Sequence, residues 1–194
     1  MDGFEKRTQL KRQNIKEAAL DLFTRNGIKK VSISQIAKEA NVSQVTIYNY
    51  FDSKENLLKE AMEYYVEKSF EHYQRLLDAS IPFPDKIEKM IFQKTEITGT
   101  IHEEIYAYFL DNSEEQASYL EKIYQEKSVP FFQQLISEGK ESGFIREDLS
   151  ENAILLFLHM FNDYMQKKDL SEILLPITED IMHLFFYGIM GKRN

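Results

Sequence analysis

One short polar segment of the chain suits contacts with the edges of DNA bases. If residues 44–51 form a helix with Ile47 and Phe51 turned inward, its outer side carries five residues: Gln44, Val45, Thr46, Tyr48 and Asn49. Side-chain amides of Gln and Asn pair with the edge of adenine, and Val can touch the methyl group of thymine. The segment therefore predicts a helix that reads bases in the major groove.

Residues 33–51 (ISQIAKEANVSQVTIYNYF) have the spacing of two helices joined by a tight turn. Ala37 is the small residue where the helices cross, and Asn41 tolerates the positive φ that such a turn needs. The apolar positions that face a shared core are Ile36, Ala40, Val42, Ile47 and Tyr50. This pattern predicts a helix-turn-helix motif, although a plain helical hairpin inside a core would share part of it.

Residues on both sides extend the motif. They are AALDLF at 18–23, Gly27, VSISQIAKEA at 31–40, Val42, Ser43, TIYNYF at 46–51 and SKENLL at 53–58. With these residues the chain resembles the TetR family of bacterial transcription regulators over about residues 8–62. Asn41 stands where the family usually has glycine. Beyond residue 62 the resemblance is limited to length and helix rhythm.

The resemblance implies DNA contacts for eight residues. Those expected to reach bases are Gln44, Val45, Tyr48 and, as in some members of the family, Ser34. Those expected at the phosphate backbone are Thr46, Asn49, Tyr50 and Lys54. Tyr50 also matches an inward position of the motif, so its ring can pack while its hydroxyl points outward. For Ser32, simple helix capping explains the residue better than a contact with DNA.

Lys54 has an unusual place for a lysine. It lies in the first turn of a predicted helix, where the helix dipole and unpaired N–H groups favour an anion. A phosphate partner would account for it, and a solvated lysine offset by Glu55 is the alternative. Four further basic residues are interpreted as an arm ahead of the first helix, unless they are merely disordered: Lys6, Arg7, Lys11 and Arg12.

The elements that must position these residues are expected to be helices. The chain has only seven Gly and four Pro, and its apolar residues recur at three- and four-residue spacing. About nine helices are predicted, at 8–25, 33–40, 44–50, 53–79, 85–97, 101–111, 115–140, 151–168 and 177–190. Ser32 with Gln35, and Asp52 with Glu55, are the predicted capping boxes. Pro130 is expected to kink or divide its helix.

Two domains are expected in this all-α chain: a DNA-binding domain at 1–62 and a larger effector-binding and dimerisation domain at 63–194. Residues 1–50 hold nine Lys/Arg and five Asp/Glu, whereas residues 51–194 hold 15 and 27. Only the basic N-terminal part is suited to approach a polyanion.

The C-terminal part holds 20 of the 25 aromatic residues, which favours an apolar effector pocket. The candidate lining residues are Phe92, Tyr106, Phe109, Tyr124, Phe132, Phe157 and Phe161. Ordinary core packing is the alternative for each of them. The resemblance implies a small-molecule effector whose binding changes the spacing of two DNA-binding domains.

The two C-terminal helices, at about 151–168 and 177–190, are apolar on more than one face, which indicates a second buried surface. In the TetR family the corresponding helices pair in a dimer. A homodimer would present two reading helices about 34–36 Å apart, so the operator is expected to be a rough palindrome. The alternative is a monomer that buries these helices in its own core.

No catalytic, cofactor or metal site is expected. The chain has no cysteine, and its four histidines (His72, His102, His159 and His183) lack metal-ligand spacing. We see neither a signal peptide nor an apolar run long enough to span a bilayer, and the resemblance implies a bacterial cytoplasmic protein. The sequence therefore predicts a ligand-responsive repressor, with activation also open. The alternative is a small-molecule-sequestering protein that keeps a degenerate DNA-binding domain.

Overall fold

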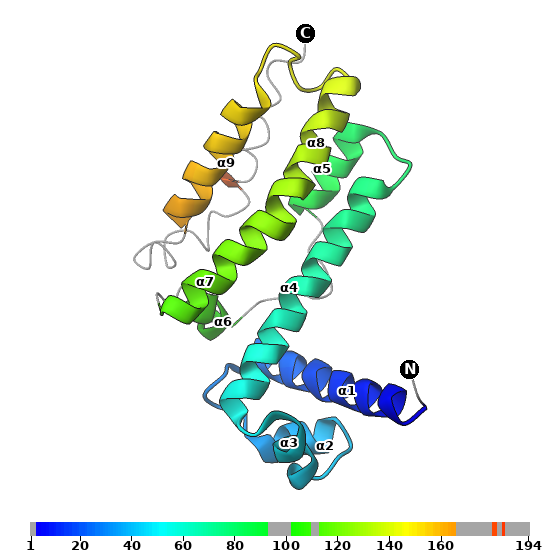
Figure 1. Ribbon diagram of the computed structural model, residues 1–194, viewed down its shortest axis with the longest axis vertical. Helices are drawn as coiled ribbons and strands as arrows, with labels where there is room; N and C mark the ends of the chain where they lie inside the picture. The colour runs from blue at the N-terminus through cyan, green and yellow to red at the C-terminus, as the bar shows by residue number, and fades with distance from the viewer. Residues whose placement is uncertain (1–2, 93–101, 110–112, 166–179, 182–183, 185–194) are drawn as a thin grey trace. The chain divides into compact units, whose positions relative to one another are not determined.

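The computed structural model describes residues 3–92, 102–109, 113–165, 180–181 and 184, and these residues form helices and turns without a strand (Figure 1). The α-helices are α1 (Gly3–Asn26), α2 (Ile33–Glu39), α3 (Gln44–Phe51), α4 (Lys54–Asp78), α5 (Phe83–Phe92), α6 (Glu103–Phe109), α7 (Glu114–Ile123), α8 (Val129–Glu141) and α9 (Glu151–Met165). The predicted all-α fold class is confirmed. The helix predicted at 177–190 lies almost entirely outside the described residues.

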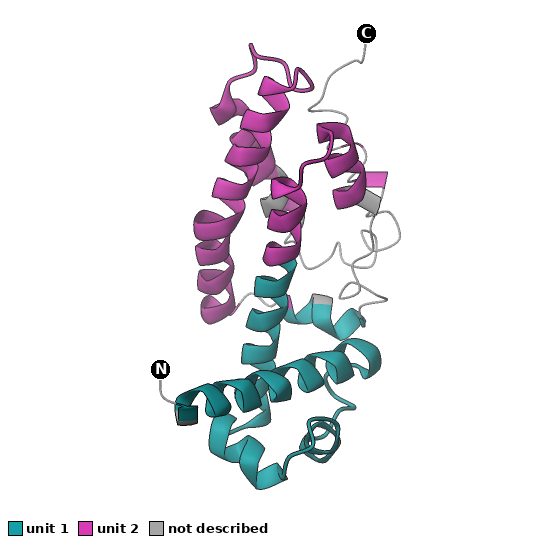
Figure 2. Cartoon of the chain, turned by 90° about the vertical axis from the view of Figure 1, so that its right-hand side faces the viewer, with its two compact units in different colours: residues 1–69, 95–108 teal, residues 70–94, 109–194 magenta. Residues whose placement is uncertain are grey.

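Two compact units make up the chain (Figure 2). The first, which we call the head, comprises Met1–Ser69 and Thr95–Tyr108. The second, the body, comprises Phe70–Lys94 and Phe109–Asn194. Helix α4 contributes its first part to the head and its last part to the body, and the domain boundary predicted after residue 62 falls inside this helix. Most of α6, although distant in sequence, is grouped with the head.

Local residue chemistry sets the ends of the head helices. Ser32 and Gln35 form the predicted capping box at the start of α2. Gly27 ends α1 with a φ of 82°, and Asn41 has a φ of 52° in the turn between α2 and α3. The prediction that Asp52 caps α4 is wrong, because Asp52 ends α3 with a φ of 62° and lacks the extended backbone of an N-cap.

Ser53 takes the capping role at α4 instead. Its hydroxyl oxygen accepts from the Asn56 N–H at 3.0 Å, and its carbonyl accepts from the Leu57 N–H at 3.2 Å. The predicted basic arm is also wrong, because α1 begins at Gly3 and the four basic residues at 6–12 lie on its first turns. Three of them are exposed, and Arg12 is half-buried.

Pro130 is accommodated without ending its helix. A π-helical segment, Tyr124–Ser128, joins α7 to α8, and the Val129 N–H donates to the Tyr124 carbonyl five residues earlier. Proline lacks the N–H that an α-helical turn would use, and widening the preceding turn is one way to absorb this. The predicted disruption near Pro130 is therefore seen as a local change of helix type between Glu114 and Glu141.

Among the described residues of the body, α4, α5, α8 and α9 share a hydrophobic core. Its buried residues are Leu77, Phe83, Ile87, Met90, Leu135, Ile136, Ile145, Ile154 and Leu158. Gly139 lets the α8 backbone approach this core closely, since an added Cβ would lie 2.6 Å from Ile145 Cδ1. Burial of these side chains is the main force holding the four helices together.

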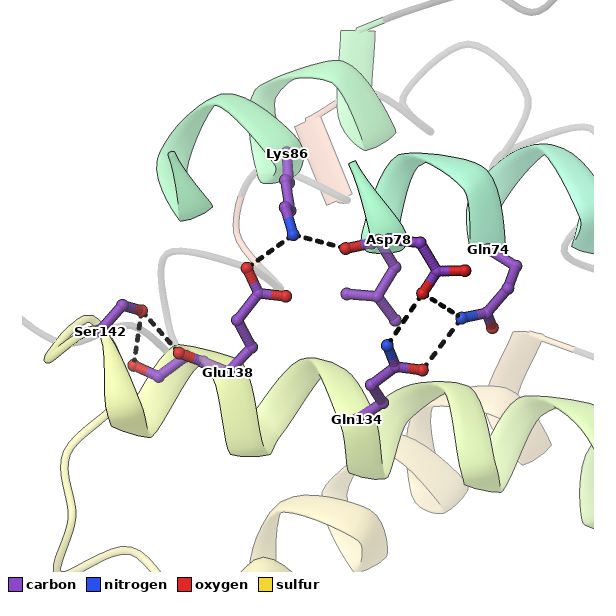
Figure 3. Close-up of polar contacts among 8 residues, drawn as sticks. Gln74, Asp78, Lys86, Gln134, Glu138 and Ser142 are labelled. Atoms are coloured by element: carbon purple, nitrogen blue, oxygen red, sulfur yellow. Dashed lines mark hydrogen bonds and ion pairs between the residues drawn. The ribbon is translucent and has the colours of Figure 1, made fainter. Parts of the chain in front are cut away.

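One buried ion pair lies beside this core (Figure 3). Lys86 of α5 places its Nζ 2.7 Å from Glu138 Oε1 of α8, and the Lys86 side chain is only 6% exposed. Lys86 Nζ also donates to the Leu77 carbonyl in the last turn of α4, where a cation complements the helix dipole. Nearby, the Gln134 amide of α8 donates to Asp78 Oδ1 at 3.1 Å. These contacts tie the end of α4 to α5 and α8.

Replacing Lys86 by methionine is expected to lower the free energy of unfolding by about 1–3 kcal/mol, because Glu138 and the Leu77 carbonyl lose their donor. Glu138 remains 30% exposed and can rehydrate, which limits the loss. Thermal unfolding measures the effect, with Lys122→Met, at an exposed lysine of α7, as the control. The double variant Lys86→Met/Glu138→Leu should recover much of the loss; equal stability of Lys86→Met and the native chain would contradict this account.

Candidate nucleic-acid interface

Buried apolar side chains on the inner sides of α2 and α3 hold these two helices in the head. Ile36 and Ala37 of α2 are 0% and 4% exposed, and Ile47 and Phe51 of α3 are 0% and 2% exposed. Helix α2 packs on both α1 and α3. Because Ile47 and Phe51 lie one turn apart, their burial fixes which side of α3 faces outward. The outward side of α3 distinguishes the two alternatives, because a hairpin inside a core would bury it and a helix-turn-helix would expose residues that can contact DNA.

The outward side of α3 carries the side chains predicted to read bases. Val45 is 66% exposed and Tyr48 is 49% exposed, although both are large and largely apolar. Gln44 and Asn49 are also exposed, as is Ser34 in the first turn of α2. Thr46 and Tyr50 are half-buried. Exposed apolar groups among amides and hydroxyls suit a surface that meets another molecule.

Ser43 is the N-cap residue of α3. Its Oγ accepts from the Thr46 N–H at 3.0 Å and lies 2.8 Å from Thr46 Oγ1. The cap satisfies one N–H at the helix end, while the other N–H groups of the first turn remain available to an anion such as a phosphate. The Thr46 hydroxyl is therefore held near the end of the helix where a phosphate contact is predicted.

Arg12 has a structural role that sequence reasoning missed. Its guanidinium forms a two-point ion pair with Glu60 of α4, with Nε 3.0 Å from Oε2, and its Cζ lies 4.8 Å from the centre of the Phe51 ring. The hydrogen bond to Glu60 raises the pKa of Arg12 above its usual value, so the guanidinium is charged at all working pH values. One side chain of α1 thus joins α3 to α4. The 48-residue separation of Arg12 and Glu60 hides this pair from sequence patterns.

Lys54 makes a contact inside the head. Its Nζ donates to the Ile28 carbonyl at 2.7 Å and lies 5.9 Å from the centre of the Phe23 ring. The ammonium group has three donors, so this bond leaves capacity for a phosphate oxygen. The predicted phosphate contact of Lys54 stays a prediction, and the lysine has a second role in holding the turn after α1.

Lys54→Ala is expected to weaken binding to all DNA sequences similarly and to reduce the slope of log affinity against log salt by about one unit. The reason is the loss of one counterion-releasing phosphate contact. Fluorescence anisotropy at several salt concentrations measures the slope, and Lys54→Arg, which keeps the charge, should retain most of it. An unchanged slope in Lys54→Ala would restrict Lys54 to its bond with Ile28.

The comparisons with known proteins agree with this geometry. A profile described as "Bacterial regulatory proteins, tetR family" matches residues 15–61. The HTH-type transcriptional repressor KstR2 of Mycolicibacterium smegmatis is 21% identical over 156 residues, which cover 76% of this chain and 74% of that protein. The fatty acid metabolism regulator protein of Bacillus subtilis is 27% identical over 150 residues, covering 74% of this chain and 75% of that protein. Residues 15–61 of this chain thus match the TetR family of regulators.

A solved structure supports the same fold over nearly the full length. The transcriptional regulator FadR from Bacillus subtilis, in complex with stearoyl-CoA, matches with a TM-score of 0.53 and 18% identity, covering 91% of this chain and 98% of that chain. The matched segment and these relatives together support a DNA-binding transcriptional regulator. The matched residues 15–61 contain α2, α3 and the first turns of α4. Helix α3 lies within this matched segment, and its reading of bases stays a prediction.

The aromatic residues predicted to line a TetR-family effector pocket occupy different surroundings. Phe109, Tyr124 and Phe132 are half-buried, and the Tyr124 ring lies 5.2 Å from that of His159 of α9. Phe132 packs against the body core, whereas Phe157 is 47% exposed on α9. The structure describes only the backbone at Phe92, Tyr106 and Phe161. Their shared role as a pocket lining stays a prediction.

Two buried polar side chains of the body were not predicted. In the described part of the chain, Gln116 Nε2 of α7 and His72 Nε2 of α4 are buried and have no hydrogen-bond partner. Gln116 is only 9% exposed. Buried polar atoms without a partner are uncommon and call for an explanation. Among the same described residues, no cluster of His, Asp and Glu is placed to hold a metal ion, and no helix is long and apolar enough to cross a membrane.

Proposed function

We propose that this TetR-family chain is a ligand-responsive repressor that binds a palindromic operator as a homodimer, in the bacterial cytoplasm and without catalysis of its own. The observation that carries the proposal is the outward face of α3, where Val45 and Tyr48 are exposed beside Gln44 and Asn49. Exposed large apolar side chains lower the solubility of an isolated protein, and such a face is typical of a surface that binds a partner. The basic balance of residues 1–50 favours DNA as that partner.

The dimer is supported by the exposed face of α9. Leu156, Met160 and Tyr164 follow one another at four-residue spacing and are 59%, 61% and 52% exposed, and Phe157 beside them is 47% exposed. Large apolar side chains in such a stripe suit helix-to-helix packing against a second copy. A twofold dimer presents two α3 helices to successive major grooves when they are about 34–36 Å apart.

Selection from a randomised DNA duplex library by the purified chain tests the proposal. We expect enrichment of a near-palindromic site whose half-sites are separated by about one helical turn. Repression follows where such a site overlaps a promoter, since a bound dimer excludes polymerase. Recovery of unrelated sequences, with mass spectrometry showing no co-purified ligand, would contradict the proposal and favour a sequestering protein with a degenerate head.

The effector that we propose is a long-chain fatty acyl thioester. The name of the Bacillus subtilis relative and the ligand in the solved structure of FadR support this class. The body supplies many aromatic side chains for an apolar tail, and the buried Gln116 amide and His72 ring nitrogen suit the polar part of such a ligand.

A release experiment tests this ligand class. Stearoyl-CoA is expected to dissociate the chain from its selected operator, because it would bind the DNA-free form more tightly. Free coenzyme A, which lacks the acyl chain, should have little effect at the same concentration. If stearoyl-CoA changes neither operator binding nor the thermal unfolding midpoint, the effector belongs to another class, while the DNA-binding proposal stands.

A further inference from the structure

Helix α6 contacts the turn that follows α1, inside the head. The Lys29 N–H donates to Glu104 Oε2 at 2.8 Å, and the His102 N–H donates to the Thr24 carbonyl at 3.2 Å. The partners are 75 residues apart for the first bond, so these are tertiary contacts. Residues 95–108 are accordingly grouped with the head and not with the body (Figure 2).

The fit between His102 and Gly27 is close. Gly27 has a φ of 82°, and a Cβ added there would lie 2.7 Å from His102 Cε1. The position thus needs glycine for its backbone conformation and for the space that the imidazole ring fills. His102 in turn accepts from the Glu104 N–H through Nδ1, at 3.3 Å, next to the carboxylate that contacts Lys29.

The same turn is held from a second helix. Lys54 of α4 donates to the Ile28 carbonyl, and Glu104 of α6 accepts from the neighbouring Lys29 N–H. Two adjacent residues are therefore fixed through their backbones by side chains of opposite charge. Val31, two residues further on, is 1% exposed, and Ser32 caps α2. Because so few residues separate the held turn from α2, its position constrains where the helix-turn-helix begins.

We propose that Glu104 is a positioning residue for DNA binding, because it fixes the turn at residues 27–30 and thereby the placement of α2 and α3. This inference rests on the proposed function. Backbone hydrogen bonds, first that from Lys29, lower the pKa of Glu104, so the carboxylate stays ionised and able to accept at neutral pH. An element outside the helix-turn-helix thus contributes to the geometry of the DNA-reading surface.

Three variants of the full chain test the proposal. Glu104→Ala removes the acceptor, Glu104→Gln keeps a side-chain oxygen that can accept from Lys29, and Glu103→Ala is the matched control at an exposed neighbour. In Glu104→Ala, hydrogen exchange of the Lys29 amide is expected to rise about 10-fold or more, since a bonded amide becomes free. Operator affinity is expected to fall about 3–10-fold, as for the loss of one hydrogen bond to a charged group.

The two readouts separate this inference from the proposed function. In Glu104→Gln, the exchange rate of the Lys29 amide and the operator affinity should both stay within about twofold of the native values. Glu103→Ala should change neither quantity. Unchanged exchange at Lys29 in Glu104→Ala would overturn the proposal without any DNA being present. Faster exchange with unchanged operator affinity would also overturn it, because the turn would then be free to move without consequence for DNA. If the native chain selects no operator, the proposed function is contradicted, whatever the hydrogen exchange of Lys29 shows.

Discussion

Replacing Tyr48 by alanine is expected to lower operator affinity by about 5–150-fold, which corresponds to about 1–3 kcal/mol for a lost base-reading contact. Tyr48 is 49% exposed on the outward face of α3, so its removal takes little from the core. The thermal unfolding midpoint should therefore stay close to that of the native chain. Fluorescence anisotropy with the selected operator and with a scrambled duplex measures both specific and non-specific affinity.

Comparison with Tyr48→Phe shows which part of the side chain acts. If the ring packs against bases or sugars, Tyr48→Phe keeps most of the affinity; if the hydroxyl donates to a base or a phosphate, it resembles Tyr48→Ala. Binding to the scrambled duplex should change little in either variant, because phosphate contacts dominate it. A Tyr48→Ala chain that binds the operator as tightly as the native chain would exclude the outward face of α3 as the reading surface.

Introducing a charge in the exposed stripe of α9 is expected to have the second large effect. Met160→Glu would place an unpaired carboxylate in the proposed dimer interface, and its desolvation should weaken dimerisation by about 100-fold or more. Operator affinity should fall with it, since one head alone reads only a half-site. Analytical ultracentrifugation over a range of concentrations measures the dimer, and a DNA titration measures the consequence.

Leu10→Glu is the matched control for this substitution. Leu10 of α1 is 59% exposed and Met160 is 61% exposed, so the two substitutions introduce a carboxylate at similarly exposed positions. Leu10→Glu should leave the sedimentation coefficient unchanged. A Met160→Glu chain that remains dimeric would show that the exposed face of α9 is not the contact between copies.

Features set by neighbouring residues were predictable from the sequence. The Ser32–Gln35 box, the glycine end of α1 and the positive φ of Asn41 depend on residues within a few positions of one another. The helix-turn-helix face followed from the burial of Ile47, which sets the orientation of α3. Even locally, two adjacent cap residues competed: Asp52 ends α3 with a positive φ, which leaves Ser53 to cap α4.

Contacts between distant residues could not be predicted in this way. The Arg12–Glu60 pair, the Lys86–Glu138 pair and the bond from Lys29 to Glu104 each join charged or polar groups 48 to 75 residues apart. In the sequence, such residues look like ordinary solvated positions. Lys54 illustrates the limit: its place at a helix start suggested a phosphate, whereas only the fold shows that its ammonium also holds the Ile28 carbonyl.

Cross-linking from Val45 tests the central claim, that α3 lies in the major groove of an operator. The chain has no cysteine, so Val45→Cys carries a single photoreactive group, and Val45 is 66% exposed. After irradiation on the selected operator, we expect cross-links at two clusters of bases, related by the twofold axis and about one helical turn apart. Leu10→Cys, labelled in the same way, is the control. Retained operator binding without base cross-links from position 45 would contradict the account.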